Sequence, residues 1–299
     1  GNPVRVGPDF RYVADRGLET DTTARVWNLA TGRPARLGGH GGCAHFVRFN
    51  PAGDRVVTAE RFPHNNLYLW DVATGAKLAT LTGHENQITE AVFSPDGTRL
   101  VSISEDRTAR LWDVPAGATA APVAAAQLLG RHTGMVRRVA YNPAGTRVVT
   151  GADDRTVRVW DARTGEELTV LRGHGDGISA VGFRDATGEV VSVGADNTVR
   201  VWDAAGAESG AAVRLHRGFV YQAAFFPAGD RVASAAWDGT CKVWDPTTGR
   251  ELARYAHGTE TYVVAVAVDP TGRYVATAAR QEGVDMRTVR LWDAATGRE

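Results

Sequence analysis

The sequence lacks the features that mark membrane, secreted and zinc-bound proteins. No run of about 18 or more consecutive apolar residues is present, so we expect no membrane-spanning helix and no membrane partner. The first residues, from Gly1 to Arg5, show no basic segment followed by an apolar stretch, so we expect no secretory signal. Only Cys43 and Cys241 are present, far apart and without a ligand spacing. We therefore expect no disulfide framework, no metal, no cofactor and a reducing compartment, most simply the cytoplasm.

An excess of charge of one sign is also lacking. The 34 basic and 34 acidic residues give a formal net charge of zero. Nucleic-acid-binding proteins usually carry a basic surplus, so we expect no nucleic-acid partner. Lysine is scarce, because Lys77 and Lys242 are the only lysines among the 34 basic residues. This scarcity, with abundant Ala, Val and Gly, points to a GC-rich bacterial genome.

An internal repeat is the strongest signal that is present. A Trp followed by Asp or Asn recurs at intervals of 43, 42, 48, 42, 42 and 48 residues, at Trp27, Trp70, Trp112, Trp160, Trp202, Trp244 and Trp292. A fixed period of this length is typical of repeat architectures, which should be recognised before any single element.

Each repeat predicts short antiparallel strands. In residues 142–161 a turn of Asn, Pro, Ala and Gly precedes a β-branched run, and a polar turn then leads into a segment that alternates polar and apolar residues. Such alternation between Gly, Pro and Asp clusters indicates strands joined by hairpins. No apolar stripe of helical period is present, so we expect almost no helix.

In these features the chain resembles the WD-repeat (WD40) family over essentially its whole length. The resemblance implies an all-β, seven-bladed β-propeller with four antiparallel strands per blade, forming a single domain over residues 1–299. Because the sequence ends soon after Trp292, we expect the last blade to lack its outermost strand, which leaves a strand edge for another chain.

Four polar positions recur with the Trp. In the family they form a hydrogen-bonded tetrad in which Trp donates to Ser or Thr, which meets His, which meets Asp. The complete sets are His84, Ser102, Asp106 and Trp112; His132, Thr150, Asp154 and Trp160; His174, Ser192, Asp196 and Trp202; and His216, Ser234, Asp238 and Trp244.

Three blades depart from this pattern. The second keeps His40 and Thr58 but has no Asp in its turn. The last has a lengthened turn at residues 281–286, and in the first blade Ala14 stands in the hydroxyl position. We expect these blades to use partial networks.

The repeated Ser, His and Asp do not predict a catalytic triad. A triad needs one exposed nucleophile beside an oxyanion hole, whereas these groups occur in four equivalent copies, each tied to a Trp. We therefore expect no catalytic residues and no enzyme activity. A propeller enzyme of the hydrolase or lactonase type, with carboxylates and a metal in a central channel, is the alternative from another class.

Positions that differ from blade to blade are the better candidates for function. In the family, the face that carries the tight turns with the tetrad Asp, and the loops between successive blades, commonly binds partners. On that face we predict an exposed aromatic patch of Phe219, Tyr221, Trp237 and Tyr262 beside the channel mouth, with Arg137 as a charged anchor two blades away. Local packing, or plugging of the channel by one or two of the rings, is the structural alternative.

We therefore predict a non-catalytic scaffold or sensor domain that binds a protein or peptide and is part of a larger bacterial signalling protein. An intramolecular role, in which the domain contacts flanking domains and holds one inactive, is a further alternative.

Overall fold

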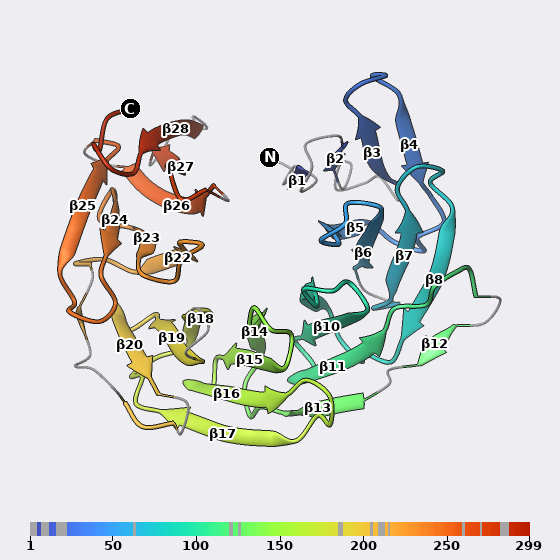
Figure 1. The fold of residues 1–299 in the computed structure, drawn as a ribbon, viewed down its shortest axis with the longest axis horizontal. Helices are drawn as coiled ribbons and strands as arrows, with labels where there is room; N and C mark the ends of the chain where they lie inside the picture. Colours follow the sequence, from blue (N-terminus) through green and yellow to red (C-terminus); the bar gives the residue numbers. More distant parts are fainter. Residues whose placement is uncertain are drawn as a thin grey trace. The chain divides into compact units, whose positions relative to one another are not determined.

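The structure is a computed structural model. It describes residues 5–6, 12–15, 23–61, 64–119, 122–124, 127–184, 188–203, 206–208, 213–214, 216–258, 261–269, 271–281 and 287–299. All regular secondary structure in this part of the chain is β, in 28 strands that form seven sheets (Figure 1). This confirms the predicted class, an all-β chain with seven antiparallel, blade-like sheets. The chain divides into two compact units, residues 1–141 with 162–166, and residues 142–161 with 167–299. That residues 1–299 form a single domain stays a prediction.

The first unit contains three sheets and the strand β14 (Val136–Tyr141). The first sheet runs in chain order through β1 (Arg5–Val6), β2 (Tyr12–Asp15), β3 (Ala24–Asn28) and β4 (Pro34–Leu37). The second contains β5 (Ala44–Phe49), β6 (Arg55–Glu60), β7 (Leu67–Asp71) and β8 (Lys77–Thr82). The third contains β9 (Ile88–Phe93), β10 (Arg99–Ser104), β11 (Thr108–Asp113) and β13 (Gln127–Arg131).

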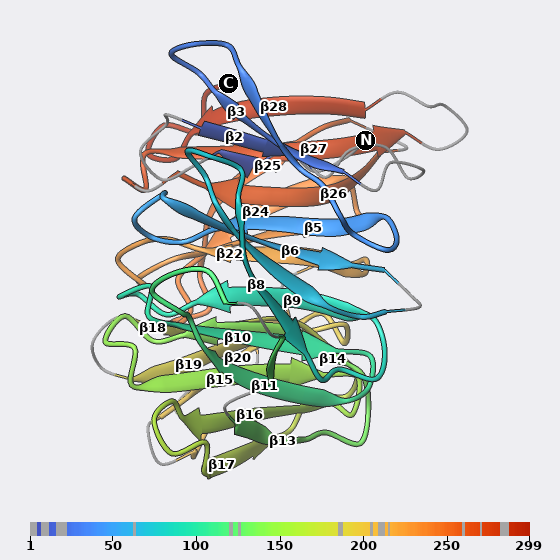
Figure 2. The same ribbon diagram turned by 90° about the vertical axis from the view of Figure 1, so that its right-hand side faces the viewer.

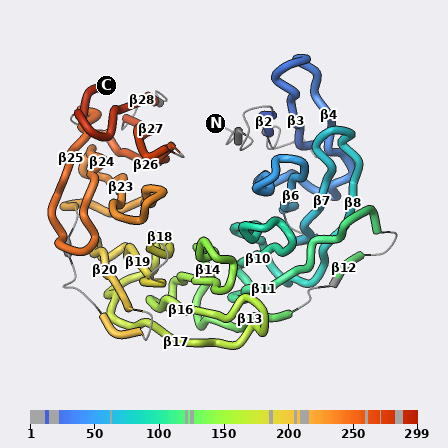
Figure 3. The backbone as a smooth tube through the Cα atoms, in the orientation of Figure 1, coloured from blue at the N-terminus to red at the C-terminus, as the bar shows by residue number. Residues whose placement is uncertain are grey.

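One strand of this unit was not expected from the repeat. β12 (Val123–Ala124) pairs in parallel with β8 and makes the second sheet five-stranded (Figure 3). It belongs to the insertion that lengthens the interval between Trp112 and Trp160 to 48 residues. Arg55 fixes the start of this insertion, because its guanidinium donates to the carbonyls of Pro115 at 2.5 Å and Ala116 at 2.9 Å.

The second unit contains the antiparallel strands β15 (Arg147–Ala152), β16 (Thr156–Asp161) and β17 (Glu167–Arg172) and three further sheets. The first of these contains β18 (Ile178–Arg184), β19 (Glu189–Gly194), β20 (Thr198–Trp202) and β21 (Val213–Arg214). The next contains β22 (Val220–Phe225), β23 (Val232–Ala236), β24 (Thr240–Trp244) and β25 (Glu251–Ala256).

The last sheet has three strands among the described residues, as expected: β26 (Thr261–Val268), β27 (Tyr274–Gln281) and β28 (Arg287–Asp293) (Figure 2). Val289 and Leu291 of β28 are 75% and 55% exposed. Cys241 and Val243, at the same positions of β24, are buried in a core cluster with residues of β26. The availability of the β28 edge to another chain stays a prediction.

Strand register corrects one predicted position. Each tetrad hydroxyl lies opposite the residue two before the repeat Trp, as Ser102 lies opposite Arg110. In the first sheet that partner is Arg25, and it lies opposite Asp15, whereas Ala14 lies opposite Val26. The hydroxyl position of the first sheet is therefore Asp15 and not Ala14. The prediction was wrong by one residue because it was made by aligning the sequence, and register alone decides which residues share a face.

Candidate functional site

The tetrad hydrogen bonds are present in the third sheet, in the fifth, which contains β18 to β21, and in the sixth, which contains β22 to β25. In each, the Trp Nε1 donates to a Ser Oγ at 2.8–3.0 Å, and the His Nε2 lies 2.7–2.8 Å from the same Oγ. The His Nδ1 lies 2.7–3.1 Å from an Asp oxygen. These sets are His84, Ser102, Asp106 and Trp112; His174, Ser192, Asp196 and Trp202; and His216, Ser234, Asp238 and Trp244. Because the indole N–H points at the hydroxyl oxygen, the hydroxyl proton is left for the His Nε2, and the His Nδ1–H then donates to Asp.

The Trp–hydroxyl hydrogen bond also occurs in the fourth sheet, which contains β15, β16 and β17, and in the last sheet. In the fourth, Trp160 donates to Thr150 at 2.9 Å, His132 is buried, and Asp154 accepts the backbone N–H of Thr156 at 3.0 Å. In the last, Trp292 and His257 both meet Thr277, at 2.8 and 2.6 Å. All of these hydroxyl-bearing residues are buried to within 1% of full burial, so none presents a nucleophile to a substrate.

Burial and hydrogen bonding set the charge of the tetrad in the third sheet. Burial alone would raise the pKa of the Asp106 carboxyl, but hydrogen bonds from His84, Thr108 and the backbone N–H of Glu85 outweigh it and hold that pKa well below its usual range. Burial lowers the pKa of His84, and Asp106 offsets this only in part. The pair is therefore an anionic carboxylate against a neutral imidazole at neutral pH.

The second sheet replaces the missing Asp with groups that the sequence analysis overlooked. The fully buried Glu60 accepts a hydrogen bond from the hydroxyl of Tyr68, whose ring packs edge-on against His40 at 4.9 Å between centroids. Burial, together with the hydrogen bond to Glu60, raises the pKa of Tyr68 to about 12. Tyr68 lies opposite Thr58, where the third sheet has Arg110 opposite Ser102. The sequence did contain a signal for this change, because Tyr68 stands two positions before its repeat Trp, where the other six repeats have Arg or Lys.

Replacing Tyr68 with phenylalanine is expected to lower the free energy of unfolding by about 1–3 kcal/mol, because the buried Glu60 carboxylate loses its hydrogen-bond donor. Urea denaturation followed by circular dichroism measures the change. Replacing Tyr274, which lies partly exposed at the start of β27, with phenylalanine is the control and should change little. Equal effects of the two substitutions would contradict the assigned role of Tyr68.

The four predicted aromatic residues lie together in the second unit. The Trp237 ring is 6.1 Å from Phe219, 5.7 Å from Tyr221 and 5.4 Å from Tyr262, measured between centroids. Phe219 and Tyr221 meet edge to face at 5.4 Å. All four centroid distances lie within the range of about 4.5–7 Å that is typical of aromatic pairs. We call Phe219, Tyr221, Trp237 and Tyr262 the aromatic cluster.

Local structure explains how the cluster is presented. Phe219 and Tyr221 flank the fully buried Val220, and Tyr221 is the extra residue of a β-bulge, since Val220 and Gln222 pair with the adjacent residues Ala236 and Ala235. The backbone N–H of Trp237 donates to the carbonyl of Phe219 at 3.0 Å, which ties the turn to the start of β22. Trp237 is 49% and Phe219 41% exposed, while Tyr221 and Tyr262 are half-buried.

Arg137, the predicted charged anchor, belongs to the first unit. It lies on β14, and its guanidinium is 3.4 Å from the sulfur of Met135. Its role beside the aromatic cluster stays a prediction, as does the position of the cluster beside a central channel.

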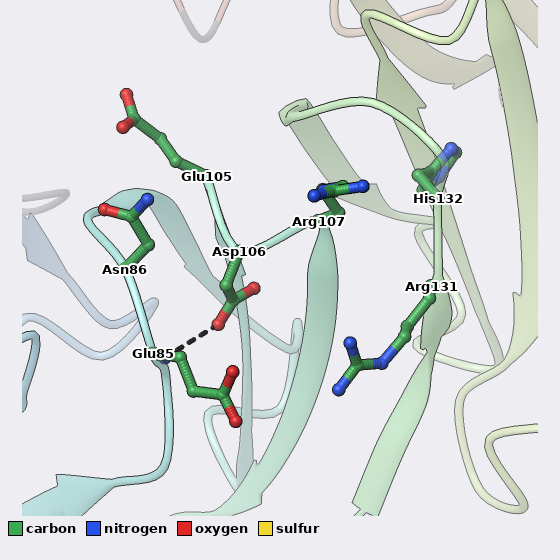
Figure 4. A pocket seen from close by; sticks show the side chains of 7 residues that line it. All are labelled: Glu85, Asn86, Glu105, Asp106, Arg107, Arg131 and His132. Carbon is green, nitrogen blue, oxygen red and sulfur yellow. Dashed lines mark hydrogen bonds between the residues drawn. The ribbon is translucent and has the colours of Figure 1, made fainter.

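A polar pocket of about 370 Å³ opens on the third sheet (Figure 4). Figure 4 shows Glu85, Glu105 and Asp106 on one side of it and Arg107 and Arg131 on the other. Asp106 accepts the backbone N–H of Glu85 at 3.0 Å and also belongs to the tetrad. The pocket is therefore a charged surface that is open to solvent, and its lining contains no activated nucleophile.

Metal sites and membrane-spanning helices are two further features to consider among the described residues. No group of three or more His, Cys, Asp or Glu side chains there is placed to hold a metal ion. No helix in that part of the chain has the length and apolar character needed to cross a membrane.

Comparison with known proteins relates the repeat to a family. The family model "WD domain, G-beta repeat" matches residues 75–113, 126–161, 165–203 and 211–245. The chain is 31% identical over 118 residues to "B-type cell cycle switch protein ccs52B" of Medicago truncatula, covering 38% of this chain and 24% of that protein. It is 35% identical over 105 residues to "Nuclear distribution protein PAC1" of Arthroderma otae, covering 32% of this chain and 22% of that protein. It is 38% identical over 78 residues to "WD repeat-containing protein 1" of Bos taurus, covering 25% and 12%.

The matched parts thus span at most about a quarter of the length of these relatives. They come from a plant, a fungus and a mammal, so the bacterial origin stays a prediction. The matched segments contain the complete tetrads, and at least three successive antiparallel strands recur in each of the seven sheets. The chain belongs to the WD40-repeat family.

Proposed function

We propose that this chain is a non-catalytic interaction module that binds a protein or peptide partner through the aromatic cluster. The observation that carries the proposal is the exposure of Trp237, 49%, in a cluster with three other rings. A tight-turn Trp contributes little to the blade core, and exposed aromatic clusters are a solubility liability unless a partner covers them. Trp and Tyr are also enriched among the residues that dominate binding energy.

The module fits a role as the scaffold or sensor part of a larger bacterial signalling protein in the cytoplasm. The family membership supports this assignment, as does the lack of a disulfide between Cys43 and Cys241. A hydrolase is the less well supported hypothesis, because the repeated Ser and Thr hydroxyl groups are buried beside the indole rings that donate hydrogen bonds to them. A role in holding a flanking domain inactive would use the same surface.

The double substitution of Trp237 and Tyr221 by alanine is expected to abolish partner capture while the fold survives. Truncation at binding hot spots costs about 2 kcal/mol or more of binding free energy per residue, so two such losses weaken a complex several hundred-fold or more. The measurement is quantitative mass spectrometry of proteins retained by the immobilised chain, together with thermal unfolding of each variant.

The matched control replaces Leu168 and Leu252, which are 48% and 39% exposed elsewhere in the same unit, with alanine. This control should retain every captured protein. If the aromatic variant unfolds, or captures the same proteins as the control, the cluster is structural and the proposal fails.

A further inference from the structure

We propose that the aromatic cluster recognises an acidic peptide segment, in which a bulky apolar side chain lies between aspartate or glutamate residues. This inference rests on the proposed function and adds the chemistry of the partner. Its basis is the pair of arginines, Arg217 and Arg280, that lie at the borders of the cluster.

The centre of the surface is apolar and held in place. Trp237 contacts the three other rings, and the loop before β22 packs closely under it, since a Cβ on Gly218 would lie 3.2 Å from the Trp237 Cβ. The sheets that supply Tyr221 and Tyr262 are neighbours, because β22 and β26 contact each other (Figure 1). A preorganised aromatic floor of this kind suits an aliphatic or aromatic anchor.

Arg217 lies at the border next to Phe219 and Trp237. It is two residues before Phe219, and its backbone N–H donates to Asp238 Oδ2 at 3.2 Å, which places it beside the Trp237–Asp238 turn. Its side chain is exposed, and its guanidinium has no hydrogen-bond or ion-pair partner among the described residues.

Arg280 lies at the border next to Tyr262. The two residues are directly opposite each other in the pairing of β26 with β27, so their side chains leave the same face of the sheet. Arg280 is exposed and has no carboxylate partner among the described residues.

Asp238, the acidic residue beside the cluster in the chain, does not neutralise these arginines. Its carboxylate already meets the His216 ring, the Thr240 hydroxyl and the backbone N–H of Arg217. Its side chain is only 17% exposed. The exposed charges that adjoin the cluster in sequence or register, within the described residues, are therefore cationic, which complements an anionic partner.

An acidic peptide fits this surface better than a nucleic acid does. Two described cations beside one cluster neutralise few phosphates, and the chain as a whole has a formal net charge of zero. A basic peptide would meet two guanidinium groups without compensation. Carboxylates on either side of an apolar anchor would engage both arginines while the anchor covers Trp237.

Selection from a random-peptide display library tests the proposal without assuming a sequence. The baits are the intact chain and its Trp237→Ala variant, and peptides retained only by the intact chain are sequenced. We expect enrichment of Asp and Glu on both sides of an aromatic or large aliphatic residue. The strongest peptide is then labelled, and its binding is measured by fluorescence polarisation.

Charge reversal distinguishes the arginines from the rings. Arg217→Glu combined with Arg280→Glu should weaken binding of that peptide about tenfold or more, and should remove most of the weakening caused by raising salt from about 0.1 M to about 1 M. Arg250→Glu is the matched control, because Arg250 is exposed in the turn that follows β24, at the strand end opposite Trp237. It should leave binding unchanged, and circular dichroism should show the same fold for all variants.

Each other outcome overturns a defined part of the proposal. Peptides that depend on Trp237 but are neutral or basic refute the acidic partner and leave the proposed function standing. If no selected peptide depends on Trp237, both the inference and the proposed function fail. Binding of a labelled single-stranded oligonucleotide that is lost with Trp237→Ala and exceeds peptide binding would assign the surface to nucleic acid instead.

Discussion

Replacing Trp112 with alanine is expected to lower the free energy of unfolding by about 3–5 kcal/mol. The indole is fully buried in a core cluster with Leu67, Leu69 and Ile88. Its Nε1 donates at 2.8 Å to Ser102, which also meets His84. The substitution therefore opens a large cavity and removes one donor from a buried polar network, and both effects act in the same direction.

Trp27 provides the matched control for this substitution. It occupies the same repeat position in the first sheet of the same unit, but it is 37% exposed. Trp27→Ala should therefore cost clearly less, because less apolar surface leaves water when this residue folds. Urea denaturation followed by circular dichroism compares the two variants. Equal losses of stability would show that the tetrad Trp does not derive its effect from burial.

The repeat made most of the fold predictable. A Trp at a period of about 42 residues, together with turn residues and alternating strands, requires stacked antiparallel sheets, since one such unit cannot bury both of its faces. The tetrad geometry in the third, fifth and sixth sheets could be anticipated because each group recurs at a fixed distance from its Trp. For such groups, position in the repeat determines the hydrogen-bond partner.

The parts that were missed are those where register or tertiary packing decides. The sequence predicted Ala14 at the hydroxyl position of the first sheet, whereas strand pairing places Asp15 there. Sequence spacing alone defines such a position only to within one residue. β12 is a two-residue strand, and segments of that length carry no periodic signal. The hydrogen-bonded pair Glu60 and Tyr68 stands in place of the expected Asp. The family pattern did not predict this pair, because neither residue is of the expected type.

The aromatic cluster shows what sequence position can and cannot supply. The four residues were identified because they occupy variable positions, and the structure places their rings within 5.4–6.1 Å of one another along the contacts described above. The bordering arginines were not identified, because Arg280 meets Tyr262 only through the register of β26 and β27. Charge around a surface is thus harder to predict than the residues at its centre.

Lowering the pH from about 7 to about 5 is expected to destabilise the fold, because the folded state keeps buried histidines neutral. Burial lowers the pKa of His84, His174 and His257 below the value of about 6.5 that holds in an unfolded chain. The unfolded chain therefore binds more protons as the pH falls through 6.5, and the contribution of each neutral histidine, fully present above that pH, is lost below it. For His84 the loss continues with each further fall in pH until the folded imidazole itself takes up a proton.

A second loss is expected at lower pH. The pKa values of Asp106 and Asp238 are held below the usual range by hydrogen bonds that outweigh burial. Their stabilising contribution is present above about pH 3.9, the unfolded value for Asp, and disappears as the pH falls further toward the folded values. The two groups of residues therefore give two successive declines in the free energy of unfolding, one below about pH 6.5 and one below about pH 4.

The variant His84→Gln separates this mechanism from a general effect of acid. It removes one titrating group, so its free energy of unfolding should fall less steeply than that of the unmodified chain between about pH 7 and about pH 5, whatever its stability at neutral pH. Urea denaturation at a series of pH values measures the slope. A free energy of unfolding that stays level or rises on acidification over this range would mean that the folded histidines gain protons as readily as the unfolded ones. Such a result would contradict the neutral imidazole of His84, on which the hydrogen-bond directions in the tetrad of the third sheet depend.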